Sequence, residues 1–192
     1  MSADDGTMKA RAREYLKTKG SDLPGKIVRE RVAAAFEALD AFLETVPPDR
    51  AAIRGIPGEW SVQEIVDHLV ETHRPGVDEL RCLLAGQRPP GDAIPAGLLS
   101  KAPLLRPWSW LRREPRAVHD DILTLLDGVP SDFTTPARAP LVMVVSVPAP
   151  GGGARELHWE EDCDWKAYSI VWRLHASAHL NQAKKTLAAA TS

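Results

Sequence analysis

The stretch that most constrains this chain is the segment 166–189, which the spacing of its apolar residues predicts to be the final helix. It carries His175 and His179, and positions i and i+4 lie on one face of an α-helix about one turn apart. Two imidazoles placed in this way can bind one metal ion. The alternative is that the two histidines bind no metal and either hydrogen-bond to neighbouring residues or are exposed. Three further side chains are expected near the same face: Tyr168, Trp172 and Gln182.

Length and composition indicate an ordinary soluble protein. The 192 residues suit one domain, so residues 1–192 are treated as a single domain. No run approaches about 18 uncharged apolar residues, so no membrane span is expected. A formal net charge of -2 gives no reason to expect nucleic-acid binding. Cys82 and Cys163 form no C-x-x-C motif, and the N-terminus has no apolar signal-peptide core, so a reducing, cytoplasmic location is expected.

The predicted helix over residues 61–85 has a clear start signal. Ser61 and Glu64 form a capping box, in which the side chain of each residue accepts a hydrogen bond from the backbone N–H of the other. Trp60 precedes the cap, in the position of a hydrophobic staple. The helix should therefore begin sharply at Ser61, with His68 on its inner face about two turns further on.

The rest of the chain predicts two more helices, a long connection and a hairpin. Apolar stripes indicate helices over residues 24–46 and 116–127. Residues 86–115 are rich in proline and glycine and are expected to form a long insertion. A nucleic-acid or membrane-surface patch is conceivable there, but we expect its tryptophans to pack on the domain and its arginines to be solvated. A β-branched run followed by three glycines predicts a β-hairpin over about 141–160.

The expected fold class is all-α, with four main helices, the insertion after the second and the small hairpin before the fourth. Amphipathic helices of this length bury their apolar stripes by forming a bundle. Because bundle sites are built from facing helices, His68 could join His175 and His179. Three neutral imidazoles leave a metal with open positions, which is typical of a catalytic site. Zinc, nickel and iron all accept imidazole ligands.

Two of these motifs resemble a known family. Trp60-Ser-Val-Gln-Glu-Ile-Val-Asp-His68-Leu69, followed over a hundred residues later by H-x-x-x-H-x-x-Q, is similar to the DinB/YfiT superfamily of metalloenzymes. The resemblance covers about residues 25–85 and 116–189, and implies a DinB-like four-helix bundle with a divalent metal on three histidines. These correspond here to His68, His175 and His179. Family members of known activity include transferases and isomerases that use mycothiol or bacillithiol, and many members have no known activity. The insertion and the hairpin depart from a typical member, so no substrate is carried over.

Other polar residues near the three histidines receive separate expectations. Glu71 and Thr72 flank the azimuth of His68, so either could orient an imidazole or simply lie on the helix surface. His73 lies about 140° around the helix from His68 and is expected to point away. Two histidines without a paired spacing are expected to be exposed: His119 and His158.

Three functions are compatible with this pattern. The first is a metal-dependent enzyme with a small-molecule substrate, either a transferase or isomerase that activates a low-molecular-weight thiol, or a hydrolase that activates water. The second is a non-catalytic, stress-associated metal-binding bundle. The third is an interaction module that uses Trp108 and Trp110. No certain general base lies near the histidines, which favours the thiol. A homodimer is compatible with all three, and no nucleic-acid or membrane partner is expected.

Overall fold

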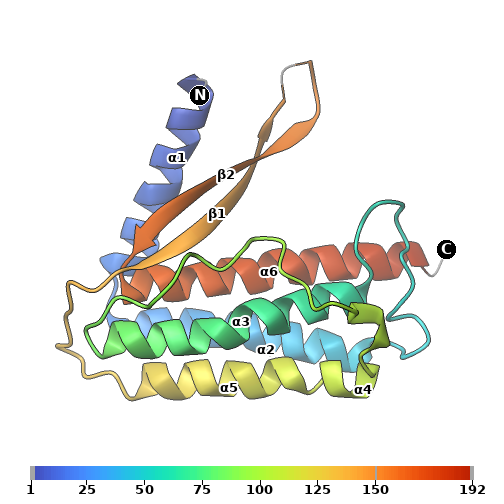
Figure 1. Cartoon of the computed structure of the whole chain (residues 1–192), viewed down its shortest axis with the longest axis horizontal. Helices are drawn as coiled ribbons and strands as arrows, with labels where there is room; N and C mark the ends of the chain where they lie inside the picture. Colours follow the sequence, from blue (N-terminus) through green and yellow to red (C-terminus); the bar gives the residue numbers. More distant parts are fainter. Residues whose placement is uncertain (1–2, 150, 191–192) are drawn as a thin grey trace.

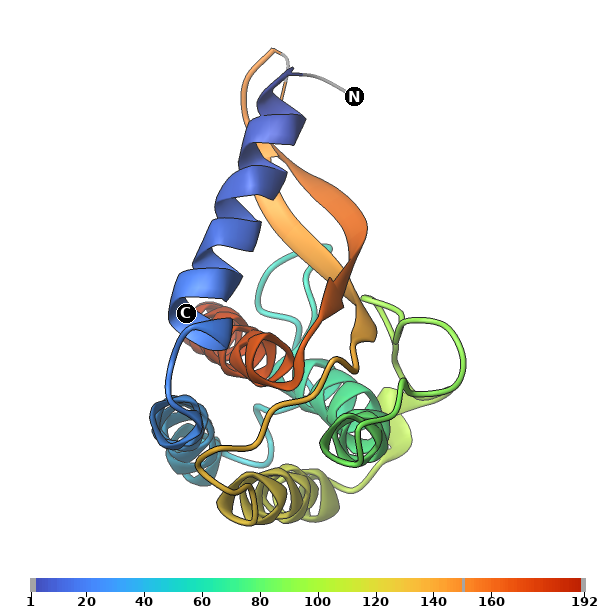
Figure 2. The ribbon, with the colours of Figure 1, turned by 90° about the vertical axis from the view of Figure 1, so that its left-hand side faces the viewer.

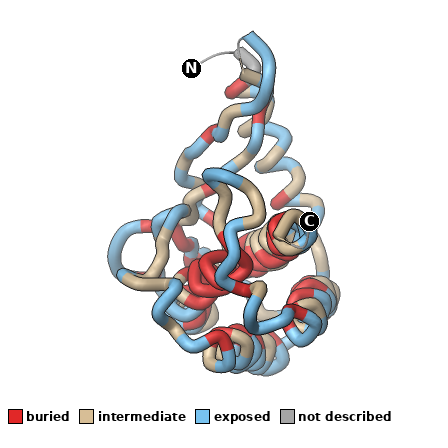
Figure 3. The backbone as a smooth tube through the Cα atoms, turned by 90° about the vertical axis from the view of Figure 1, so that its right-hand side faces the viewer, coloured by how far each residue is buried: buried red, intermediate tan, exposed pale blue. Residues whose placement is uncertain are grey.

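The computed structural model describes residues 3–149 and 151–190. It is mostly helical with one two-stranded antiparallel hairpin, which confirms the predicted class in this coarse form (Figure 1). The four long helices that run alongside one another are α2 (Gly25–Thr45), α3 (Val62–Leu84), α5 (Glu114–Asp127) and α6 (Trp165–Ala190). Helices α2 and α3 each pack against both α5 and α6. The buried positions of these helices lie mainly where the helices face one another (Figure 3). No helix in the described ranges is long and apolar enough to cross a membrane.

The two helices that carry the histidine motifs both begin at side-chain caps. The predicted capping box is confirmed: Ser61 Oγ accepts from the N–H of Glu64 at 3.2 Å, and Glu64 Oε2 accepts from the N–H of Ser61 at 2.9 Å. At the start of α6, Asp164 Oδ1 accepts from the backbone N–H groups two and three residues further on, both at 3.0 Å. Each cap satisfies donors that a helix start leaves free, so it fixes where the helix begins.

The predicted insertion contains short helices of its own. It includes η2 (Pro103–Leu105) and α4 (Trp108–Leu111), and α5 begins at Glu114, two residues before its predicted start. Trp108 is buried and packs against the core, as expected for the tryptophans of this segment. The expectation of solvated arginines is wrong for Arg106, because its guanidinium lies 2.9 Å from Asp67 and 2.8 Å from Glu71 on α3.

The insertion covers the side of α3 that would otherwise face solvent. Besides Arg106, the backbone N–H and hydroxyl of Ser100 both donate to the Asp67 carboxylate at 2.8 Å. As a result every residue from 62 to 70 is buried. A buried carboxylate is costly unless it is paired, and Asp67 has three partners. The first half of α3 is therefore enclosed on all sides.

The hairpin and the first helix stand together on one side of α6 (Figure 2). Strands β1 (Ala139–Pro148) and β2 (Ala154–Cys163) pair along their whole length and are longer than predicted. Helix α1 (Ala3–Leu16) lies beside β2, and Arg13 pairs with Glu161 at 2.8 Å while Arg155 pairs with Asp5. The short π-helix η1 (Lys17–Ser21) then leads toward α2. Helix α1 and the hairpin together form a wall that faces the side of α6 carrying His175 and His179.

Candidate metal centre

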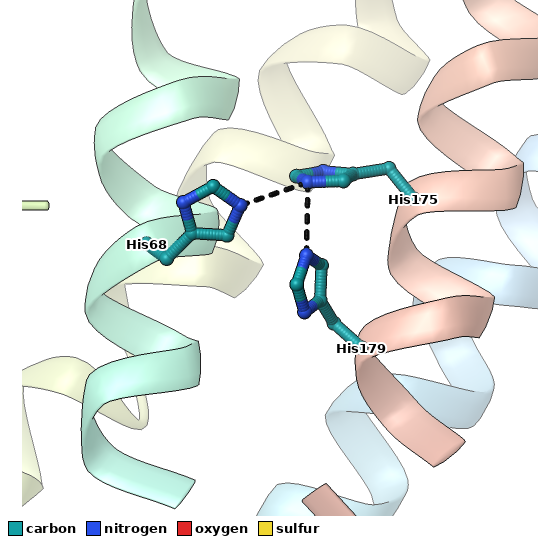
Figure 4. Close-up of side chains that lie close together, drawn as sticks. All are labelled: His68, His175 and His179. Carbon is teal, nitrogen blue, oxygen red and sulfur yellow. Dashed lines mark hydrogen bonds between the residues drawn. The ribbon is translucent and has the colours of Figure 1, made fainter. Parts of the chain in front are cut away.

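Three imidazoles from two helices meet between α3 and α6 (Figure 4). Nε2 of His68 lies 3.0 Å from Nε2 of His175, and Nε2 of His179 lies 3.1 Å from the same atom. Ligand atoms of all three residues fall within 4.8 Å of one another. The structure thus brings together the three histidines that the sequence pattern singles out, and together they could hold a metal ion.

The outer nitrogen of each imidazole has its own partner. Nδ1 of His68 lies 2.7 Å from the backbone oxygen of Leu98, and Nδ1 of His179 lies 2.8 Å from Oε1 of Gln182. An oxygen of this kind can only accept, so both imidazoles carry their hydrogen on Nδ1 and leave Nε2 as a free lone pair. Nδ1 of His175 lies 3.0 Å from Nε2 of His73. Partners of this kind set the ring orientation of metal-binding histidines.

Burial keeps these imidazoles uncharged. Desolvation lowers the pKa of His68, with the hydrogen bond to Leu98 and the charge of Asp67 opposing the shift. Desolvation, reinforced by His68, lowers the pKa of His179 to about 4. The pKa of His175 falls well below its ordinary value for the same reasons, burial first and its two histidine neighbours second. A neutral imidazole is the form that binds metals, so the centre is ready for a cation at neutral pH.

Five neighbours are expected either to support an imidazole or to line a pocket, and of these Gln182 contacts a cluster imidazole directly. Thr72, Tyr168 and Trp172 line a small pocket together with His175. Glu71 pairs with Arg106 instead. The hydroxyl of Thr72 donates to the backbone oxygen of His68, not to its ring. The hydroxyl of Tyr168 donates to Glu79. The Trp172 ring meets the His73 ring edge-on, with centroids 4.5 Å apart.

Two expectations about histidines outside the cluster are wrong. His73 does not point away: it is 1 % exposed and bonds to His175, although it is not one of the three grouped residues. His119 is not exposed but equally buried. The expectation for His73 assumed that its side of α3 meets solvent, whereas α5 and α6 both pack against α3. The expectation for His119 rested on its lack of a paired spacing, which does not show that its ring stacks on Phe36 of α2. His158 is half exposed, as expected.

Two contacts to the cluster were not foreseen. The indole of Trp60 lies with its centroid 5.0 Å from the His68 ring and 6.2 Å from the His179 ring. Its position before the cap marked it as buried, but not as part of the site. Leu98 contributes through its backbone oxygen, which any residue has, so no sequence pattern could have indicated it.

A groove of about 840 Å³ lies beside the cluster, between α6 and the wall made by α1 and the hairpin. His175 and His179 both line it, as does Trp60. Most of the remaining lining is apolar: Met8, Ala12, Leu16, Val142, Met143, Val144, Val145, Val171, Leu174 and Ala178. On its other side, His175 also lines a smaller pocket of about 70 Å³ that contains Glu79 and Tyr168. The cluster is therefore accessible to a small molecule.

Comparison with known proteins gives one family and one fold neighbour. A sequence model of the DinB superfamily matches residues 30–162, a stretch that includes His68 and ends before His175. A crystal structure of an uncharacterised protein from Escherichia coli UTI89 superposes with a TM-score of 0.57 over 85% of this chain and 92% of that chain, at 16% identity. At that identity the likeness concerns the fold alone. No curated protein matches the sequence.

Proposed function

This chain belongs to the DinB superfamily, and from that premise we propose that it is a divalent-metal-dependent enzyme whose metal is held by His68, His175 and His179. The observation that carries the proposal is the convergence of three Nε2 atoms beside an open groove. In the same proposal, α2, α3, α5 and α6 form the family's four-helix bundle, and residues 1–192 act as a single domain.

The donor set fits a divalent metal. A metal held by imidazoles lies about 2.0–2.1 Å from each nitrogen, so nitrogens 3.0 and 3.1 Å apart are within reach of one ion. Zinc, nickel and iron suit such ligands. Among the residues that the structure describes, the group contains no carboxylate or thiolate. Three neutral ligands leave the full positive charge of the ion available for chemistry.

A bound divalent cation would lower the pKa of a thiol or of water and so supply a nucleophile near neutral pH. The surrounding residues favour the thiol. Glu71 flanks His68 in the helical projection and could have served as a general base, but its carboxylate pairs with Arg106. Hydrolysis needs groups that move protons during the reaction, whereas a thiolate attacks without further deprotonation. We therefore propose a thiol-dependent transferase or isomerase.

The thiol would come from outside the chain. Desolvation raises the pKa of Cys163 to about 12, so this buried thiol is a poor nucleophile. Cys82 lies near the far end of α3, 14 positions from His68 and about 21 Å along the helix axis. Both cysteines are unpaired, which supports a reducing, cytoplasmic setting in which a low-molecular-weight thiol stays reduced.

The groove would hold the second reactant. Its volume of about 840 Å³ lies in the range of small-molecule sites, and its walls are mostly apolar. Apolar walls from α1 and the hairpin would keep water away from the reacting atoms, and Trp60 would bound the groove next to His68 and His179. Holding an electrophile beside the sulfur supplies proximity, which is a large part of catalysis in reactions of two molecules.

Metal analysis tests the centre. We expect purified wild-type protein to bind about one divalent ion, and His68→Ala, His175→Ala and His179→Ala each to lose most of it. His158→Ala is the matched control, because this side chain bonds to Glu156 on the exposed hairpin and does not belong to the group of three histidines. Retention of the full metal content by any of the three cluster variants would contradict the assignment.

Cobalt substitution tests the thiol chemistry. The cobalt form should develop a sulfur-to-cobalt charge-transfer band when titrated with mycothiol, bacillithiol, glutathione or cysteine, and the thiol that gives the band should support turnover of an electrophile such as chlorobimane. If no thiol gives the band or turnover, the transferase proposal fails while the metal centre stands. Turnover of an ester without thiol would instead point to a metal-activated water.

A further inference from the structure

Two buried ring nitrogens behind the metal centre lack a hydrogen-bond partner among the described residues: Nδ1 of His73 and Nε2 of His119. Both side chains are 1 % exposed, and their ring centroids are 5.6 Å apart. Each ring uses its other nitrogen. Nε2 of His73 meets Nδ1 of His175 at 3.0 Å, and Nδ1 of His119 meets Oδ1 of Asp40 at 3.1 Å. A buried polar atom without a partner is costly, so two in neighbouring rings call for an explanation.

We propose that Asp40 on α2 orients the metal ligand His175 through His119 on α5 and His73 on α3. This inference rests on the proposed metal centre. It extends that centre from His175 through two further histidines to Asp40 on α2. Asp40, His119 and His73 are positioning residues, since none of them faces the groove. Their effect is to bias His175 toward the form with hydrogen on Nδ1 and a free lone pair on Nε2.

The direction of the bonds follows from Asp40. A carboxylate only accepts, so His119 carries its hydrogen on Nδ1 and leaves Nε2 as an acceptor. That acceptor is matched if His73 carries its hydrogen on Nδ1, since a small ring rotation then lets this N–H donate to Nε2 of His119. Nε2 of His73 is thereby left as an acceptor for Nδ1–H of His175. This one arrangement uses both unpartnered nitrogens.

The opposite arrangement gives His175 a hydrogen on Nε2 that can donate to Nε2 of His68 or His179, but it leaves a buried conflict behind the cluster. If His73 carried its hydrogen on Nε2 and donated to His175, its Nδ1 would be a second bare acceptor next to Nε2 of His119. The packing leaves little room for the half-turn of either ring that would avoid this. Phe36 stacks on His119 with centroids 3.8 Å apart at an angle of 9°, and Trp172 meets His73 edge-on. The charge of Asp40 therefore favours the arrangement in which His175 presents a lone pair to a metal.

The network also gives a role to the carboxylate of Asp40 beside His119. Asp40 accepts from His119 while Arg116 approaches it only to 4.0 Å, so the histidine is the closer partner. Carboxylates that act on metal-binding histidines, directly or through other groups, raise the basicity of the ligand and fix its orientation, and their loss commonly weakens metal binding by 10- to 100-fold.

The test compares Asp40→Leu with a matched control. Asp127→Leu removes a carboxylate from another α2–α5 contact, the Arg29–Asp127 pair, which has no path to His73. In metal-free protein labelled with ¹⁵N-histidine, we expect the fraction of His175 with hydrogen on Nδ1 to fall in Asp40→Leu and to stay at the wild-type value in Asp127→Leu. Asp40→Glu should restore it, because the carboxylate is retained. A zinc titration against a chromophoric chelator should show the dissociation constant rising about 10-fold in Asp40→Leu alone.

His119→Phe is the second variant, because it keeps the ring that stacks on Phe36 and removes both nitrogens. It should reproduce the effect of Asp40→Leu whether or not that variant folds well. An unchanged His175 hydrogen position in both variants would overturn the inference, as would equal changes in Asp127→Leu. If the wild-type protein binds no zinc, the proposed function fails, and the hydrogen position in metal-free protein still decides whether Asp40 acts on His175.

Discussion

Hydrogen placement on single imidazoles decides what the centre can bind. His68 and His179 each face an oxygen acceptor with Nδ1, so each must present a lone pair from Nε2 toward the interior of the cluster. A lone pair at each of two or three converging nitrogens is a poor arrangement for neutral rings by themselves and a good one for a cation. In the metal-free protein these imidazoles are buried, so protonating them lowers the stability of the folded state.

Acid should destabilise the metal-free protein in a defined pH window. The folded pKa of His179 is lowered to about 4, against an ordinary value of 6.5. The unfolded chain therefore binds more protons between these values, so stability is fully present above about pH 6.5 and is lost as pH falls toward 4. Each such histidine adds a slope of about 1.4 kcal/mol per pH unit. Urea unfolding at a series of pH values, with excess chelator, measures that slope.

The residue responsible can be identified by substitution. His179→Gln removes one titrating group, so the slope of unfolding free energy between pH 6 and 4.5 should fall by about 1.4 kcal/mol per pH unit. Ser109→Ala, at an exposed position of α4, changes no titrating group and should leave the slope unchanged. Equal slopes for His179→Gln and wild type would mean that His179 is readily protonated in the folded state.

At the scale of elements, the start of α3 and its close approach to α6 set where the ligands lie. Ser61 begins α3 seven residues before His68, so the cap determines the register of the ligand. Further along, Trp172 of α6 lies against Gly76 of α3, where an added Cβ would fall 1.9 Å from ring atom Cζ2. One end of α3 is thus fixed by a hydrogen-bonded cap and its middle by a contact that only glycine permits.

Loss of the cap should cost stability. Ser61→Ala removes the acceptor for the N–H of Glu64, and losing such a cap costs about 1 kcal/mol. The midpoint of chemical denaturation should fall accordingly. Ser109→Ala, at an exposed position of α4, is the control and should leave the midpoint within error. No change in Ser61→Ala would show that the capping bond is not a net contributor.

Adding one methyl group at Gly76 should be more damaging. Gly76→Ala places Cβ inside the Trp172 ring, so the ring or the helix must move, which costs about 1–3 kcal/mol or more. Gly6→Ala in α1 meets nothing within 4 Å and should be neutral or stabilising, because alanine favours helix. Thermal unfolding of both variants gives the comparison, and equal stability of the two would contradict the contact.

Elements with their own local signals were predictable, and contacts between distant elements were not. The capping box of α3 depends on two residues three positions apart, so the sequence displays it directly. The cluster itself could be predicted because two ligands share one helix and the third lies on an inner face. His73 was missed because a helical projection assumes an exposed face, whereas this side chain lies against His119 of α5 and His175 of α6. Leu98 was missed because it acts through its backbone oxygen.

For the whole molecule, metal binding and folding should be coupled. The proposed ligands come from α3 and α6 and are separated by more than a hundred residues in sequence, so an unfolded chain cannot present the three nitrogens together. A ligand that binds only the folded state stabilises it by about 2.7 kcal/mol at a hundredfold excess over its dissociation constant.

This coupling is measurable as a thermal shift. Adding zinc to chelator-treated wild-type protein should raise the melting temperature by several degrees, and the shift should grow with zinc concentration. His68→Ala should show little shift, while His158→Ala should behave as wild type. A concentration-independent melting temperature in wild type would argue against a site formed by folding. Whether the protein forms a homodimer stays a prediction, and sedimentation of the same samples addresses it.

The contact between Trp172 and Gly76 also bears on which ion the centre can select. A rigid indole against a bare backbone sets a fixed spacing between α3 and α6, the two helices that supply the ligands. Such a spacing resists contraction because the ring cannot be compressed, and resists expansion because the packing would open. Imidazole ligands by themselves discriminate poorly among zinc, nickel and iron. Because the Trp172 ring holds the distance between α3 and α6 constant, the three nitrogens would suit some ions better than others. The ionic radius and the preferred coordination angles would then determine which ion this protein retains.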